Sequence, residues 1–90
     1  AFQLLAELAQ RLVVAVRARV RGSGGRRGVS AEGLREDLLG LFRGVPGVQV
    51  DYIAFFDPET LEAVARVVRG TQMALAVFVG STRLIDNGRL

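Results

Sequence analysis

Apolar residues recur at three- and four-residue steps along the first twenty positions of the chain. This spacing is typical of one face of an amphipathic helix, which Leu8 and Val13 widen. No capping residue precedes the helix, and Ala1 already lies within the pattern, so we expect residue 1 to be an internal cut in a longer parent protein. The apolar stripe consists of Phe2, Leu5, Ala9, Leu12, Val16 and Val20.

A glycine-rich segment, residues 22–28 (GSGGRRG), ends this helix. It departs from the dinucleotide-binding fingerprint because Arg27 stands where the third glycine belongs. It also lacks the Gly-Lys-Ser/Thr ending of a phosphate-binding loop, and it follows a helix rather than a strand. The segment is therefore predicted to be an interhelical loop.

A second helix is predicted to begin at Ser30, a favourable N-cap. Acidic residues follow within its first two turns, where the positive end of the helix dipole favours them. Gly44 is expected to end the helix, and Pro46 prevents its continuation. The predicted apolar face of this helix consists of Leu34, Leu38, Leu41 and Phe42.

From Val48 the period changes to two, which indicates a strand as far as Phe56. The turn formers Asp57 and Pro58 end it. Residues 61–70 fit either a short helical turn or an irregular edge strand. The two predicted faces of the strand are Val48, Val50, Tyr52, Ala54 and Phe56 on one side, and Gln49, Asp51, Ile53 and Phe55 on the other.

Two further strands complete the pattern. Residues 73–79 are apolar on both faces, which is typical of a central strand. A two-residue hairpin turn at residues 80–81 would place Phe78 opposite Arg83, whose stem could cover the ring. The same register pairs Val79 with Thr82, Val77 with Leu84 and Leu75 with Asp86. The predicted fold is one α+β domain over residues 1–90, with two helices packed on a three-stranded antiparallel sheet.

The composition excludes several kinds of chemistry. The chain contains no His, no Cys and no Lys, so a thiol nucleophile, a histidine general base and a zinc site are all ruled out. The longest apolar run, residues 73–79, is far shorter than the roughly 20 residues of a membrane-spanning helix. We expect no membrane partner, and the absence of cysteine fits a cytoplasmic protein.

Positive charge gathers in the first half of the chain. Residues 11–27 hold six arginines and no acid. One interpretation is a free-standing, non-catalytic module that binds an anionic partner through this segment. The other is a solvated helix end, with arginines near the negative pole of the helix dipole. No interleaved aromatic residues are present to stack on bases, so we expect no nucleic acid partner.

Three segments in order, residues 46–52 (PGVQVDY), 57–62 (DPETLE) and 80–87 (GSTRLIDN), resemble the end of the pantoate–β-alanine ligase (pantothenate synthetase) family. The resemblance covers essentially the whole chain and is loosest at residues 22–29. After Asn87 the sequence departs from the family, which more often has apolar residues there.

The resemblance implies the C-terminal domain of a two-domain cytoplasmic ligase, part of coenzyme A biosynthesis, that joins pantoate to β-alanine through a pantoyl-adenylate. That enzyme uses ATP and Mg²⁺. Its N-terminal nucleotide-binding domain carries the family's signature motifs, and neither motif is present here, so we assign this chain no catalytic residue, no substrate-binding residue, no cofactor and no metal. The domain would act as a lid that excludes water from the adenylate, inactive alone and partnered by the N-terminal domain.

Arg83, Asp86 and Asn87 are the candidate residues for contact with the partner domain or the adenylate. A structural interpretation stands beside this one. Arg83 could pair with an acid such as Asp51, while Asp86 and Asn87 fix the chain end through backbone hydrogen bonds. Asp51 and Asp57 could also be read as oxygen ligands of a metal, but a polar strand residue and a turn former explain them more simply. The lid hypothesis further predicts an apolar surface left uncovered where the other domain docks.

Overall fold

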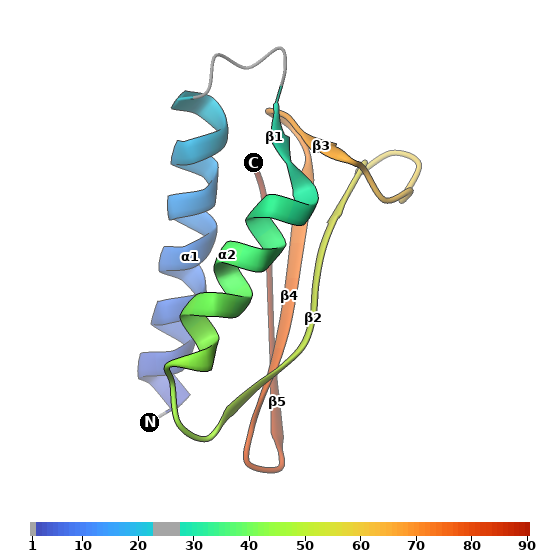
Figure 1. Cartoon of the computed structure of the whole chain (residues 1–90). Coiled ribbons are helices and arrows are strands. Elements are labelled where there is room, and N and C mark those ends of the chain that lie inside the picture. Colours follow the sequence, from blue (N-terminus) through green and yellow to red (C-terminus); the bar gives the residue numbers. More distant parts are fainter. Residues whose placement is uncertain (1, 23–27) are drawn as a thin grey trace.

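The computed structural model describes residues 2–22 and 28–90, with side chains described from residue 6 onward. Helix α1 (Phe2–Gly22) and helix α2 (Ala31–Arg43) lie side by side on one face of a three-stranded sheet (Figure 1). The α+β prediction is confirmed. The predicted loop between the helices, residues 23–27 with Arg26 and Arg27, falls outside the described residues. Within the described ranges, neither helix is long and apolar enough to cross a membrane.

The sheet consists of β2 (Val48–Phe56), β4 (Gln72–Val79) and β5 (Thr82–Arg89), in the order β2-β4-β5 and all antiparallel. The apolar strand β4 is central, as predicted. The hairpin turn lies at residues 80–81, with Gly80 at φ +61°. A left-handed residue is what such a turn requires, and glycine adopts it without steric cost. All four predicted cross-strand pairs are present, including Phe78 with Arg83.

The predicted faces of β2 are correct only as far as Val50. A β-bulge lies between Val50 and Tyr52, so Asp51 has no partner residue on β4. An extra residue in a period-two strand moves every later side chain to the opposite face. Ile53 and Phe55 are therefore buried under the helices, at 5% and 2% exposure, instead of sharing a face with Gln49. Single-strand periodicity cannot reveal a bulge, because the bulge is set by pairing with a second strand.

A second sheet was not predicted. It consists of the two-residue strands β1 (Val29–Ser30) and β3 (Arg66–Val67), paired antiparallel. This pairing resolves the ambiguity of residues 61–70 in favour of an irregular edge strand. Gly28, with φ +67°, allows β1 and β3 to approach each other closely. A Cβ atom at this position would lie 2.5 Å from the Val67 carbonyl oxygen.

The second helix begins as predicted. The Ser30 hydroxyl accepts a hydrogen bond from the Gly33 amide at 3.2 Å, and Gly44 caps the other end. Leu34, Leu38 and Phe42 are buried, but the prediction for Leu41 is wrong. Leu41 is 60% exposed and lies on the rim of a shallow groove between the two helices. The buried face of α2 is centred nearer Phe42, toward β2, so Leu41 falls at its edge.

The C-terminal end of β5 is held against α1. Arg17 Nε donates to the Arg89 carbonyl oxygen at 3.0 Å, and Arg21 Nε donates to the Leu90 carbonyl oxygen at 3.3 Å. Arg19 forms an ion pair with Asp37 of α2, 2.6 Å apart. Leu90 itself is fully buried. Three arginines of the basic segment therefore make contacts within the fold, which neither interpretation of that segment predicted.

Candidate functional site

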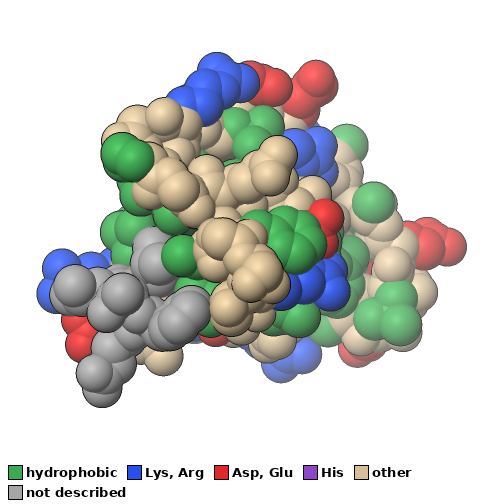
Figure 2. Space-filling view, turned by 90° about the horizontal axis from the view of Figure 1, so that it is seen from below, with side chains coloured by type: hydrophobic (Ala, Val, Ile, Leu, Met, Phe, Trp, Pro, Cys, Tyr) green, Lys and Arg blue, Asp and Glu red, His purple; other side chains and the backbone are tan. Residues whose placement is uncertain are grey.

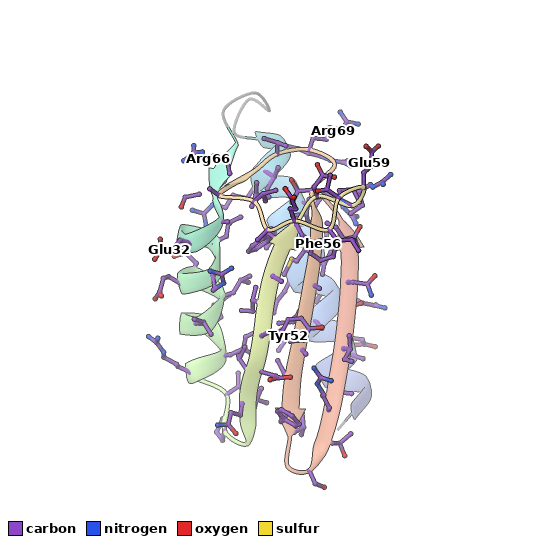
Figure 3. All side chains as sticks on the ribbon, turned by 90° about the vertical axis from the view of Figure 1, so that its right-hand side faces the viewer. Glu32, Tyr52, Phe56, Glu59, Arg66 and Arg69 are labelled. Carbon is purple, nitrogen blue, oxygen red and sulfur yellow. The ribbon has the colours of Figure 1, made fainter. Side chains whose placement is uncertain are left out.

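The sheet has one covered face and one uncovered face. Figure 3 looks onto the side of the sheet away from both helices, where the strands lie bare along most of their length. We call this side the open face. It includes Tyr52, which is 37% exposed, and Ile85, which is 57% exposed. By register and burial, the apolar residues of the open face are Tyr52, Ala54, Phe56, Ala74, Ala76, Phe78 and Ile85.

A polar cluster lies at the centre of the open face, where the β2 bulge brings consecutive residues to its surface. Arg83 Nη2 is 2.8 Å from Asp51 Oδ2, and the Arg83 guanidinium carbon lies 5.7 Å from the centre of the Tyr52 ring. The ion pair with Asp51 confirms the structural interpretation of Arg83. The guanidinium of Arg83 therefore lies over the ring of Tyr52, which the bulge moves into reach. Bulges often aim side chains in this way near functional sites.

The loop that follows β2 is closed by its own hydrogen bonds. Asp57 Oδ1 accepts from the Glu59 amide at 2.8 Å and from the Thr60 amide at 3.3 Å, as expected for a turn former. The Leu61 amide donates to the Asp57 carbonyl oxygen at 2.8 Å, and the Asp57 amide donates to the Glu62 carbonyl oxygen at 2.9 Å. One carboxylate oxygen of Asp57 is therefore engaged by the turn, which favours the turn-former interpretation over a metal ligand.

This loop, residues 64–71 around β3 and the end of β5 line a hollow of about 430 Å³ at one end of the open face. Figure 3 shows Arg66, Arg69 and Glu59 around that end, above Phe56. Arg66 Nη2 donates to the Gly28 carbonyl oxygen at 3.0 Å. The charged residues lining the hollow are Asp57, Glu59, Arg66, Arg69 and Arg89. In the described part of the chain, no three His, Cys, Asp or Glu side chains gather as they would around a metal ion.

The three candidate contact residues do not lie together. Arg83 and Asn87 alternate onto the open face, whereas Asp86 points to the helix side, where it lines a cavity of about 170 Å³ beside Ala9 and Gln10. Asp86 Oδ1 accepts from the Asn87 amide at 2.9 Å, which is a local backbone contact. Of the three, Arg83 and Asn87 therefore lie on the open face and Asp86 does not.

The lower end of the molecule carries charged side chains of both signs. Figure 2 shows blue and red side chains next to each other there, with hydrophobic groups between them. Charges of both signs therefore mix at that end, and no continuous field of one sign forms in this view. Such mixing is ordinary for the surface of a globular domain.

The sequence matches a known protein family along nearly its whole length. The family model "Pantoate-beta-alanine ligase" covers residues 4–89. The chain belongs to the pantoate–β-alanine ligase family. The resemblance inferred from three short segments is thus confirmed at the level of the family, a group of ligases in pantothenate biosynthesis.

Curated ligases of this family are much longer than the chain. Over 60 residues it is 47% identical to the pantothenate synthetase of Desulfatibacillum aliphaticivorans, a match that covers 67% of this chain and 21% of that protein. Over 54 residues it is 50% identical to the enzyme of Geobacter sulfurreducens, covering 60% of this chain and 19% of that protein. The chain therefore spans about a fifth of the length of the curated relatives it matches.

The fold is also that of part of a solved ligase. The crystal structure of pantothenate synthetase from Thermus thermophilus superposes with a TM-score of 0.66 at 33% identity, covering 88% of this chain and 27% of that one. Within the pantoate–β-alanine ligase fold, the three segments of the resemblance meet at the open face. Residues 51–52 and Arg83 form its polar cluster, and residues 57–62 form the loop at its end.

Sequence reasoning missed one feature of that loop. Leu61 is 71% exposed and has φ +63°, the left-handed backbone region that residues other than glycine rarely adopt. Within the described ranges it is the only non-glycine residue with positive φ. No signal in the sequence marks it, because leucine has no preference for that conformation and the loop's hydrogen bonds alone impose it.

Proposed function

We propose that the chain is the C-terminal lid domain of a pantoate–β-alanine ligase, and that it is inactive by itself. The observation that carries this proposal is the open face, an uncovered sheet surface with Tyr52 and Ile85 exposed. An exposed apolar patch on a protein surface often marks the place where another protein or domain binds. The open face, on the side of the sheet away from the helices (Figure 3), is an uncovered surface of the kind that the lid hypothesis predicts, and it supports this proposal.

In this proposal the N-terminal nucleotide-binding domain of the same enzyme docks on the open face. That domain would bind ATP, Mg²⁺, pantoate and β-alanine, and would form the pantoyl-adenylate in the cytoplasm. The lid would keep water away from the adenylate, a mixed anhydride that hydrolyses readily. The chain's own residues supply no histidine or lysine base and no thiol nucleophile for this chemistry, because it has no His, Cys or Lys.

The alternative, a free-standing module that binds an anion through residues 11–27, has weaker support. Arg17 and Arg21 donate to carbonyl oxygens at the end of β5, and Arg19 pairs with Asp37. A partner anion would have to compete with these contacts. The remaining arginine of the described part of the segment, Arg11, is exposed on α1 and gives one charge rather than a patch.

A mixing assay tests the lid proposal. Pantothenate formation from pantoate, β-alanine and Mg-ATP is measured with the chain alone, with the separately expressed remainder of its parent ligase, and with both. We expect no product from the chain alone and a higher rate on mixing. The ratio of AMP released to pantothenate formed should fall toward one on mixing, because the lid suppresses hydrolysis of the adenylate. No change in rate or ratio, together with no complex by size-exclusion chromatography, would refute the proposal.

A further inference from the structure

An exposed leucine in a strained backbone conformation is an unusual feature for a small domain. Leu61 is 71% exposed at φ +63°. Left-handed backbone brings the Cβ atom of an ordinary residue too close to the carbonyl oxygen, and such strain persists only where surrounding contacts impose it. Exposing a large apolar side chain adds a second unfavourable feature at the same position. Neither feature helps this chain to fold.

The loop holds Leu61 in this conformation firmly. The Leu61 amide and the Asp57 carbonyl oxygen are 2.8 Å apart, and the Asp57 amide and the Glu62 carbonyl oxygen are 2.9 Å apart. The Glu62 amide also donates to the Thr60 hydroxyl at 3.3 Å. A closed hydrogen-bonded loop of this kind presents its outermost side chain in one position, and so lowers the entropy cost of binding through it.

The position of the loop indicates that Leu61 contacts another protein surface. The loop that contains it stands out beyond β3 and bends over one end of the open face, as Figures 1 and 3 show. The exposed Glu59 and Glu62 lie near it in the same loop, and Asp57 and Glu59 of that loop line the hollow together with Arg66, Arg69 and Arg89. An apolar anchor within a polar rim is the usual arrangement of a protein–protein contact.

The binding partner that we infer for Leu61 is the rest of the same ligase, because the family's enzymes are much longer than this chain. The chain matches about a fifth of its curated relatives and 27% of the Thermus enzyme, so most of such a ligase lies outside this structure. We infer that Leu61 is a preformed anchor, which inserts into an apolar pocket on the remainder of the same ligase when the open face docks. This inference rests on the proposed function, since it names the side chain through which the lid engages its own enzyme.

A pair of leucine variants tests the anchor. Leu61→Asn removes the apolar side chain and introduces a residue that tolerates left-handed backbone. Leu41→Gln is the matched control, because Leu41 is 60% exposed but lies on α2, on the helix side. Binding of each variant to the separately expressed remainder of the parent ligase is measured by calorimetry, and chemical unfolding of each variant alone is followed by circular dichroism.

We expect the Leu61 variants to lose docking without losing stability. Leu61→Asn should raise the denaturant midpoint of the isolated chain or leave it unchanged, and weaken docking about tenfold or more, as expected for losing a buried leucine. Leu61→Gly, which also relieves the strain, should weaken docking similarly, whereas Leu41→Gln should dock like the unaltered chain. If the unaltered chain docks and both Leu61 variants dock as tightly as it does, Leu61 is not an anchor, and the lid proposal stands. If the unaltered chain does not dock, both fail.

Discussion

Phe55 and Phe56 are neighbours in the sequence and face opposite environments. Phe55 is 2% exposed beneath the helices, and Phe56 is only half-buried on the open face. The side chains of the covered face pack against both helices and form the hydrophobic core. Their burial provides most of the stabilisation of the fold. The open face instead carries an ion pair, a cation–π contact and exposed apolar groups. The two sides of one sheet therefore differ in role: the covered side stabilises the domain, and the open side is left uncovered (Figure 3). The open side is where we propose that the rest of the enzyme docks.

The largest test of this contrast is to truncate each phenylalanine in turn. Phe55→Ala should lower the free energy of unfolding by about 3–5 kcal/mol, because it leaves a cavity in a closely packed core. Phe56→Ala should cost clearly less, because its neighbourhood is partly solvent. Urea unfolding monitored by circular dichroism measures both. Equal losses would mean that the open face contributes to stability as much as the covered face does.

A second test concerns the close approach of β5 to α1. A Cβ atom added at Gly88 would lie 2.6 Å from Val13 Cγ1, and the short, stiff valine side chain cannot move far aside. Gly88→Ala should therefore destabilise the chain by about 1–3 kcal/mol. Gly40→Ala is the control, because in the described part of the chain the added group on α2 meets no atom within 4 Å beyond its chain neighbours and its own helix backbone. That variant should gain about 0.5–1 kcal/mol from helix propensity. A stable Gly88→Ala protein would show that the two elements separate easily.

The polar cluster of the open face should contribute little to folding. The Asp51 and Arg83 side chains are 35% and 44% exposed, so solvent screens their attraction. A double-mutant cycle with Asp51→Asn and Arg83→Gln should give a coupling free energy below about 1 kcal/mol, falling further at high salt. Thermal or urea unfolding of the four proteins measures it. A larger, salt-resistant coupling would indicate that the cluster holds the bulge in place.

The smallest expected effect is at Ile85, which is 57% exposed on the open face. Ile85→Thr keeps a β-branched residue in the strand and should change stability by no more than about 0.5 kcal/mol. Ile53→Thr, the same change at 5% exposure on the covered face, should cost several times more because it buries a hydroxyl. Comparing the losses of unfolding free energy in the two variants shows whether side chains of the open face are packed as loosely as their exposure indicates.

Much of the fold could be predicted from the sequence because its signals are local. The Ser30 cap, the apolar strand β4 and the hairpin turn at Gly80 each depend on residues within a few positions of one another. The family could also be inferred, from three short segments. The candidate site is harder. The sequence points to Arg83 and its partner Asp51, but its periodicity places Tyr52 on the wrong face of β2, and no local signal marks Leu61.

The sequence alone determined the order and type of the main elements, the hairpin register and the absence of histidine, cysteine and lysine chemistry, because periodicity, turn chemistry and composition are properties of the chain itself. The tertiary structure decided where β2 bulges, which side of the sheet the helices cover, and that β1 pairs with β3. It also imposed the strained conformation of Leu61. Each of these depends on contacts that local sequence does not encode, where pairing and packing override local preference.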